Sequence, residues 1–364
     1  MTRKSDLKQI RLKRLKIANF KAIDAVELHF PQPRMKGDPD IHVMGSRNGL
    51  GKTSIFEACA LLFLGMYGSG TFQLARYRMD LTELFVRSGS EEARIEGDFS
   101  VSGEDREVRI CWSRLDELQI TSTIKINPMI AGREERPDES WVEQFLMLLA
   151  GYTMEPIVMQ PCLYFHSYRK VQEGKPELGM MVESEMPRQM RGRRPGRWRG
   201  PYEEGKSVST FKIKMLHAMM GTVGLFESLD KKKADKTREQ LNRLIEKYAG
   251  GTIEKLRPSH DHTFDFLITP RLSGKTGPGD PFSFDGLSSG QKEIISTLFL
   301  IWHHTLDQSG IILIDEPELH LNTEWHRDFV RQIFELAPGN QYILATHSED
   351  VFGSVDEDRR LFLE

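Results

Sequence analysis

Hydrophobic and polar residues follow one another in patterns that predict strands at the start of the chain. Residues 10–19 alternate basic and apolar side chains, and residues 25–30 resume the alternation after a polar turn, so two strands are expected. The apolar run 41–44 predicts a short buried strand. A glycine loop follows, and from Lys52 onward apolar residues recur at helical spacing. Strand, glycine loop and helix in this order are typical of a phosphate site.

Between residues 93 and 126 the pattern has a period of two. Alternate residues from 95 to 101 share one face of a strand, a polar turn follows, and alternate residues from 108 to 112 share the same face of the return strand. A third strand is expected at 118–126. These segments predict an antiparallel meander.

The last hundred residues return to α/β character. A helix is expected to end near Thr305 and another to cover 325–336, while 311–314 and 341–345 read as buried strands. In the middle of the chain, an apolar helix is expected at 141–149, and a charged helix at 229–248 carries an apolar stripe and stops at a glycine pair.

Composition and charge exclude several classes of protein. Of the 364 residues, 39% are hydrophobic and 28% charged, which is ordinary for a globular protein of two domains, or of one domain with a large insertion. The net charge of −3 excludes a wholly basic, histone-like binder. The longest apolar stretch, 58–67, is about half of what crosses a bilayer, and the start has no signal-peptide core, so a cytoplasmic protein is expected. Three widely spaced cysteines fit reduced thiols rather than a zinc site.

The glycine loop has the residues of a nucleotide phosphate loop. Successive backbone N–H groups and the helix N-terminus would cradle the β-phosphate, Lys52 would reach the β/γ oxygens, and the Thr53 hydroxyl would ligate Mg²⁺. The usual first glycine is Ser46 here, and Gly45 lies one residue upstream. The alternative is a chance glycine-rich turn before a helix. The ATP-binding residues expected in this segment are Ser46, Arg47, Asn48, Gly49, Gly51, Lys52, Thr53 and Ser54.

Two acidic residues follow the buried strand 311–314, at the end where α/β folds place their ligands. Asp315 would hold Mg²⁺ through water, and Glu316 is positioned to polarise the attacking water as general base. By itself such a pair is a solvated strand terminus. The phosphate loop upstream favours the catalytic interpretation.

The segment Leu-Ser-Ser-Gly-Gln at 287–291 reads by composition as a polar helix cap. It also resembles the signature motif of ABC-type ATPases, whose order of phosphate loop, signature, Asp-Glu strand and strand-ending histidine is found here. The resemblance implies a γ-phosphate contact for His347, and ATP contacts for the signature residues Ser288, Ser289, Gly290 and Gln291.

Two further segments indicate which branch of the ABC-type ATPases this sequence resembles. Residues 15–21 (Leu-Lys-Ile-Ala-Asn-Phe-Lys) and 315–321 (Asp-Glu-Pro-Glu-Leu-His-Leu) resemble the RecF, SMC and OLD-like ATPases rather than transporter subunits. The chain is most similar in look to stand-alone ATPases of bacterial anti-phage systems, such as those of Septu or beside retrons. The resemblance covers residues 8–68 and 282–350 well, and 130–270 hardly at all.

The resemblance implies an enzyme that converts ATP and water to ADP and phosphate with Mg²⁺. It implies a head-to-tail homodimer, in which the Lys52 loop of one subunit and the signature of the other enclose each ATP, and a separate effector such as a nuclease. The family's glutamine that senses Mg²⁺ and γ-phosphate is expected at Gln160. The expected fold is an α/β P-loop NTPase with an ABC-ATPase head at 1–90 and 271–364, a β-meander arm at 91–130 and a mostly helical insertion at 131–270.

An arginine-rich segment at 188–199 is interrupted by Gly and Pro, which argues against a helix. It could bind a nucleic-acid backbone, with the tryptophan stacking on a base, dock an acidic partner, or be a solvated loop. The contact residues would be Arg191, Arg193, Arg194, Arg197, Trp198 and Arg199.

Three functions therefore compete. The first is a defence-system sensor and scaffold that holds or releases an effector according to its nucleotide state. The second is a DNA-repair or chromosome-type ATPase acting on DNA directly, which needs segment 188–199 to bind DNA. The third, a transporter's nucleotide-binding subunit, is disfavoured by segments 15–21 and 315–321.

Overall fold

The computed structural model divides into two compact units, residues 1–169 with 304–364, and residues 170–303. Each is described separately below. Within them, the structure describes residues 10–35, 37–45, 51–66, 69–73, 81–114, 117–123, 156–159, 162–177, 180, 208–222, 230–271, 279–306, 309–319 and 321–363.

The first unit contains a largely parallel sheet that carries the phosphate loop and the acidic pair. Its strands lie in the order β15-β3-β14-β13-β9-β8, and every pair is parallel except β8 with β9. The central strands β13 and β14 are buried along their whole length, as expected for apolar runs covered on both faces. The strands are β3 (Asp40–Gly45), β8 (Ile157–Met159), β9 (Cys162–Phe165), β13 (Ile311–Asp315), β14 (Gln341–Thr346) and β15 (Arg360–Phe362).

A second sheet of the same unit is antiparallel, in the order β2-β1-β5-β6-β7-β4. It joins the N-terminal strands to the meander, because β5 pairs along β1. The meander, expected as an arm, therefore shares one sheet with the N-terminal strands. The strands are β1 (Ile10–Phe20), β2 (Ile23–His29), β4 (Gly70–Gln73), β5 (Glu92–Val101), β6 (Glu104–Ser113) and β7 (Glu117–Ser122).

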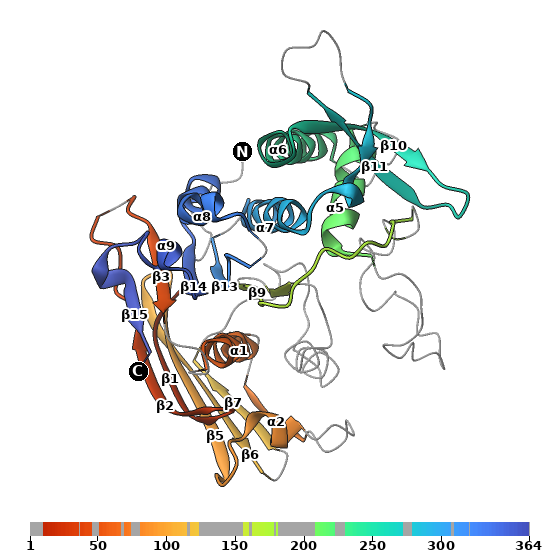
Figure 1. The fold of residues 1–364 in the computed structure, drawn as a ribbon. Helices are drawn as coiled ribbons and strands as arrows, with labels where there is room; N and C mark the ends of the chain where they lie inside the picture. Colours follow the sequence, from red (N-terminus) through yellow and green to blue (C-terminus); the bar gives the residue numbers. More distant parts are fainter. Residues whose placement is uncertain are drawn as a thin grey trace. The chain divides into compact units, whose positions relative to one another are not determined.

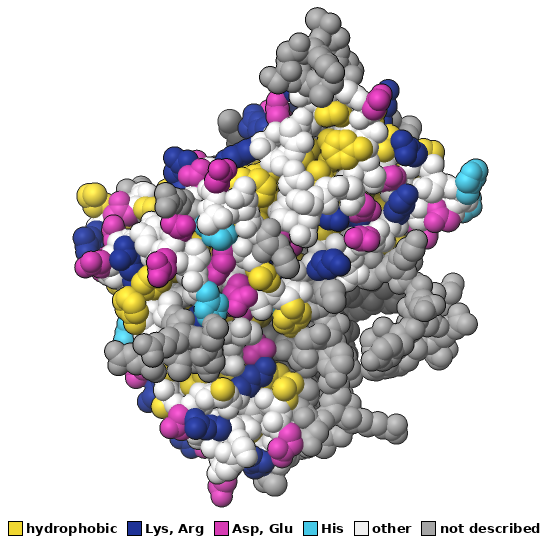
Figure 2. All heavy atoms as spheres, viewed as in Figure 1, with side chains coloured by type: hydrophobic (Ala, Val, Ile, Leu, Met, Phe, Trp, Pro, Cys, Tyr) yellow, Lys and Arg dark blue, Asp and Glu magenta, His cyan; other side chains and the backbone are white. Residues whose placement is uncertain are grey.

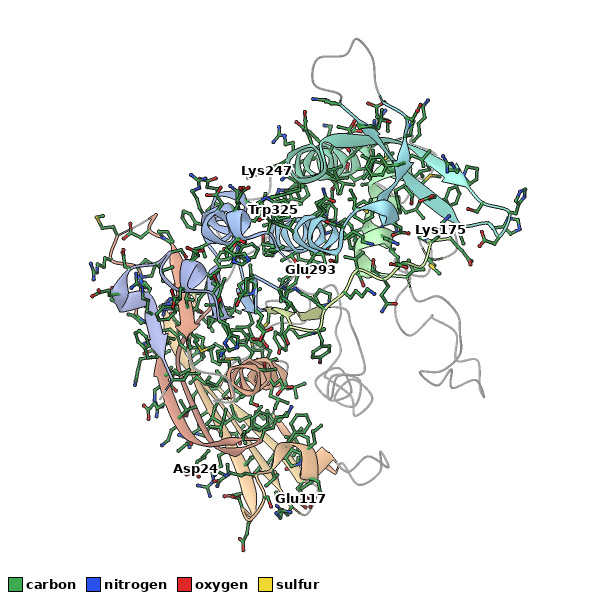
Figure 3. All side chains as sticks on the ribbon, in the orientation of Figure 1. Asp24, Glu117, Lys175, Lys247, Glu293 and Trp325 are labelled. Atoms are coloured by element: carbon green, nitrogen blue, oxygen red, sulfur yellow. The ribbon has the colours of Figure 1, made fainter. Side chains whose placement is uncertain are left out.

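Helix α1 (Lys52–Leu62) lies between the two sheets and continues into the 3-10 helix η1 (Phe63–Met66) (Figure 1). Phe56 meets Tyr164 of β9 with ring centroids 6.0 Å apart, and Phe63 meets Phe99 of β5 at 6.0 Å. Side chains from α1 and both sheets fill the space between them (Figure 3). One apolar core thus supports the helix that begins at the phosphate loop.

The outer face of the antiparallel sheet is charged, and its charges pair with one another. Lys13 pairs with Asp105 at 3.0 Å, and Arg14 pairs with Glu27 at 2.7 Å and Asp98 at 3.2 Å. Charges of both signs are interspersed over the face of the molecule seen in Figure 2. Alternation of apolar and charged residues along these strands separates the core face from the solvated one.

The remaining helices described in the first unit are one of 14 residues and several short ones. Helix α8 (Thr323–Leu336) begins at Asn322, whose side chain accepts a hydrogen bond from the backbone N–H of Glu324. Short helices are α2 (Leu81–Phe85), α9 (Glu349–Phe352) and η5 (Glu357–Arg359). Among the described residues, no helix has the length and apolar character needed to span a membrane.

The second unit combines helices with a three-stranded antiparallel sheet. The helices are α5 (Thr210–Gly221), α6 (Lys231–Ala249), the 3-10 helix η4 (Phe284–Gly286) and α7 (Ser289–Thr305), whose last residues cross the unit boundary. The strands are β10 (Gly251–Pro258), β11 (Phe264–Pro270) and β12 (Phe282–Ser283). Helix α6 ends where predicted, at Gly250 in the left-handed conformation (φ 68°). The sequence patterns did not predict this sheet.

Candidate functional site

The predicted catalytic residues meet at the carboxyl ends of three neighbouring strands. Strand β14 lies between β3 and β13, and the register places Gly45 beside Thr346 and Asp315 beside Ala345. The phosphate loop follows β3, the acidic pair ends β13, and His347 follows β14. Parallel pairing thus brings together residues about 300 positions apart in the sequence.

The described end of the predicted phosphate loop lies at the N-terminus of α1. Gly51, at the N-cap of α1, adopts φ 84°, which a residue with a Cβ adopts only at a cost. Lys52 is 6% exposed, and burial lowers the pKa of its ammonium, although the nearby carboxylates of Asp315, Glu316 and Glu318 act in the opposite direction. Its Nζ lies 3.4 Å from Nδ1 of His347. Residues 46–50 lie outside the described part of the chain, so Ser46, Arg47, Asn48 and Gly49 stay predictions.

Thr53 and Asp315 form the pair expected at a magnesium site. The Thr53 hydroxyl donates a 2.6 Å hydrogen bond to Oδ2 of Asp315. Asp315 is 1% exposed, and its other oxygen, Oδ1, has no hydrogen-bond partner among the described residues. Burial raises the pKa of the Asp315 carboxyl to about 6, and the bond from Thr53 partly offsets the rise. A buried carboxylate oxygen without a donor, beside a hydroxyl, fits a hard divalent cation such as Mg²⁺.

Glu316 points in a different direction from Asp315 because its backbone is left-handed, with φ 48°. Its N–H donates to the carbonyl of Ala345 at 2.8 Å. Its carboxylate Oε1 lies 3.5 Å from Nε2 of His347, and both side chains keep about a third of their surface exposed, 29% for Glu316 and 36% for His347. An accessible carboxylate beside an accessible imidazole suits a residue that must reach water.

Glu318 is a functional candidate that the sequence analysis did not assign. Its Oε1 accepts hydrogen bonds from the backbone N–H groups of His347 at 2.7 Å and Ser348 at 3.2 Å. Its Oε2 is buried and has no hydrogen-bond partner among the described residues. Glu318 therefore fixes the backbone that carries the histidine. Glu318 belongs to the Glu-Leu-His-Leu stretch that supported the resemblance to RecF, SMC and OLD-like ATPases, but nothing in that stretch indicated this contact.

Gly45, noted beside the unusual Ser46, is required by packing. A Cβ at this position would lie 2.6 Å from Cε2 of Phe352, whose ring also packs edge-on against Phe362 with centroids 4.8 Å apart. Phe352 ends α9, the helix that follows His347. The last residue of β3 and the segment after the histidine are thus in direct contact.

The signature turn, residues 288–291, belongs to the second unit and is stabilised by hydrogen bonds within the turn. The Ser288 N–H donates to Oε1 of Gln291 at 3.1 Å, and the Gln291 N–H donates to Oγ of Ser288 at 3.3 Å, which forms a capping box at the start of α7. The Gln291 amide also donates to the carbonyl of Tyr248 at 2.9 Å. Ser288 and Ser289 are exposed, whereas Gly290 is buried. Contacts of these four residues with ATP stay a prediction.

Two other predicted groups lie outside the described residues. Gln160 falls between β8 and β9, and the contact residues Arg191, Arg193, Arg194, Arg197, Trp198 and Arg199 fall in the range 181–207. Their roles stay predictions.

Solved structures with the same architecture identify the fold. The SMC head bound to the C-terminal winged-helix domain of ScpA matches with a TM-score of 0.53 and 14% identity over 95% of this chain and 92% of that one. A head domain with an extended coiled coil, bound to ScpA derived from Pyrococcus furiosus, matches with a TM-score of 0.50 and 13% identity over the same shares. This chain has the fold of an SMC head domain. The predicted fold class is confirmed.

Sequence comparisons agree. Residues 224–352 match the family described as "AAA domain, putative AbiEii toxin, Type IV TA system". A segment of 91 residues is 32% identical to the retron Vc95 probable ATPase of Vibrio cholerae, covering 22% of this chain and 18% of that protein. A segment of 80 residues is 31% identical to the retron Ec83 probable ATPase of Escherichia coli, covering 19% and 15%. The matches span less than a fifth of either relative, and they confirm the predicted resemblance to retron-associated ATPases.

Proposed function

We propose that this protein binds ATP with Mg²⁺, hydrolyses it to ADP and phosphate, and uses the cycle to control the association of two copies. The proposal rests on one observation, the convergence of several side chains at the carboxyl ends of the parallel strands. These side chains are Lys52, Thr53, Asp315, Glu316 and His347. Each has the chemistry and exposure that its role in phosphate transfer to water requires.

The residues divide the work as follows. The Lys52 ammonium faces the phosphates and offsets their charge, and Thr53 and Asp315 would hold Mg²⁺, which supplies further charge neutralisation when bound. Glu316 accepts the proton of the attacking water, because it is the carboxylate that stays accessible. The imidazole of His347, within reach of both Lys52 and Glu316, orients that water beside the γ-phosphate.

Hydrolysis is tested with two variants. Glu316→Gln keeps the size of the side chain and removes the base, so ATP affinity should persist while turnover falls by about 10²-fold or more. Lys52→Ala should abolish both. ATP affinity is measured with a fluorescent analogue and turnover by phosphate release. Wild-type turnover in Glu316→Gln would overturn the assignment of the base.

We infer that ATP joins two heads through the signature turn. The support is the exposed pair Ser288 and Ser289, of which Ser288 forms a capping box with Gln291. This turn resembles the one that completes the ATP site of a second subunit in ABC-type ATPases. A nucleotide bound by both copies stabilises the dimer by mass action. Sedimentation of Glu316→Gln should show dimers with ATP and monomers with ADP, and Ser288→Arg should remove the ATP effect. Failure of ATP to change the mass of Glu316→Gln would contradict the dimer.

We further propose that the switch serves anti-phage defence and acts on a separate effector such as a nuclease. The support is the similarity to the probable ATPases of two retrons. Expression of the chain with its neighbouring genes, followed by phage challenge, tests the role. Protection that survives Lys52→Ala would exclude ATP as the control.

A further inference from the structure

A buried arginine lies directly behind the acidic pair. Strand β9 runs parallel to β13, and Phe165, its last residue, pairs with Ile314. The chain then turns over residues 166–169, so this turn lies beside Asp315 and Glu316 at the end of β13. Arg169, the last residue of the first of the two segments that form this unit, is 5% exposed.

The guanidinium of Arg169 binds backbone carbonyls of both acidic residues. Its Nη1 donates to the carbonyl of Asp315 at 2.7 Å and to that of His166 at 2.9 Å, and its Nη2 lies 3.4 Å from the carbonyl of Glu316. The positive charge also lowers the pKa of the Asp315 carboxyl, against the effect of burial. A planar fork with several donors can reach successive carbonyls at once, which a lysine ammonium cannot do in the same geometry.

These contacts hold a conformation that the backbone does not favour. Glu316 has φ 48°, in the left-handed region that a residue with a side chain adopts only at a cost. Its N–H is held by the carbonyl of Ala345 at 2.8 Å, and its own carbonyl lies within reach of Arg169. Without the second contact Glu316 can rotate about its N–Cα bond toward the negative φ that residues with a side chain prefer. That rotation would carry the carboxylate of Glu316 away from His347.

We propose that Arg169 is a positioning residue for ATP hydrolysis, which holds the backbone of Asp315 and Glu316 so that the Glu316 carboxylate faces the attacking water. The inference rests on the proposed ATPase function. Arg169 acts through Glu316 and does not touch the nucleotide. The loss should therefore fall on turnover rather than on ATP affinity.

The first experiment compares Arg169→Lys with Arg359→Lys in the full chain. Arg359 is a matched control, because it is 7% exposed in the same unit and its guanidinium also donates to backbone carbonyls, those of Pro31 at 2.6 Å and Gln32 at 2.9 Å. We expect Arg169→Lys to lower kcat by about 10- to 100-fold with the Kd for ATP changed less than about twofold. Arg359→Lys should leave kcat near that of the wild type at a similar loss of Tm. Equal kcat losses in the two variants would overturn the proposal.

A double-mutant cycle shows through which residue Arg169 acts. Once Glu316→Gln has removed the base, its orientation no longer matters, so adding Arg169→Lys should change the residual kcat less than twofold. If the two losses multiply instead, Arg169 does not act through Glu316 and the proposal fails. If Arg169→Lys does not fold, Arg169→Gln, which retains a planar donor, is measured in the same cycle. The turnover of the wild type is measured first. If the wild type has no ATPase activity, the proposed function is refuted; if the wild type is active but the Arg169 variants behave like the control, only the role of Arg169 is refuted.

Discussion

Replacing Asp315 by asparagine should stabilise the ligand-free protein while it destroys the chemistry. The carboxyl is buried, and one of its oxygens has no hydrogen-bond partner among the described residues. Burial raises its pKa from 3.8 to about 6, which at about 1.4 kcal/mol per pKa unit corresponds to about 3 kcal/mol against the ionised form. Asparagine has nearly the same size and keeps an acceptor for the Thr53 hydroxyl, but it carries no charge.

The pH dependence follows from the sign of the shift. Because the folded-state pKa lies above the unfolded value, the cost is absent below about pH 4, grows as the pH rises, and is fully present above about pH 6. Asp315→Asn should therefore exceed the wild type in free energy of unfolding by up to about 3 kcal/mol at neutral pH. Near pH 4 the two proteins should be equally stable.

Urea unfolding of both proteins at several pH values measures the difference. Asp356→Asn is a control, since Asp356 is exposed at the start of η5 and caps it with no side-chain hydrogen bond. ATP with Mg²⁺ should raise the Tm of the wild type and leave that of Asp315→Asn nearly unchanged. A variant that is less stable than the wild type at neutral pH, or a difference that does not vary with pH, would refute the reasoning.

Two other contacts give predictions about the segment that carries the histidine. Glu318→Ala should lower the free energy of unfolding by about 2 kcal/mol and reduce turnover, because the N–H groups of His347 and Ser348 lose a charged acceptor. Glu318→Gln, which keeps a neutral acceptor, should lose less of each. Urea unfolding measures the stability and phosphate release the turnover, and equal losses in the two variants would contradict the contact. Gly45→Ala should cost about 1–3 kcal/mol through its clash with Phe352, and Phe352→Leu should recover part of that loss. Strict additivity in that double-mutant cycle would exclude the clash.

Local patterns were sufficient for most elements of the first unit. The strands ending at Gly45, Asp315 and Thr346 are apolar runs followed by chemically distinctive residues, so both the strands and the predicted site residues could be read from short windows. The sheet of the second unit was missed for a local reason. Strand β10 has a register irregularity between Ile253 and Lys255, which breaks the alternation on which strand prediction depends.

Contacts distant in sequence could not be predicted in the same way. The meander joins the sheet of the N-terminal strands because β5 pairs with β1, some 80 residues earlier, and no pattern within either strand indicates that partner. Arg169 and Glu318 owe their roles to backbone groups of other segments, and such groups carry no residue-type signal. An arginine after a buried strand and a glutamate in a turn both read as ordinary solvated residues until the fold is known.

The ion pairs on the outer face of the antiparallel sheet have a consequence for what adheres to this surface. Several basic groups there have a carboxylate within a few ångströms, as Lys13 has Asp105 and Arg14 has Glu27 and Asp98. A polyanion that approaches these paired groups gains little, because it must compete with carboxylates that are already in place. We therefore expect polyanions to bind this face of the sheet weakly, and charged partners to be recognised on other surfaces of the molecule.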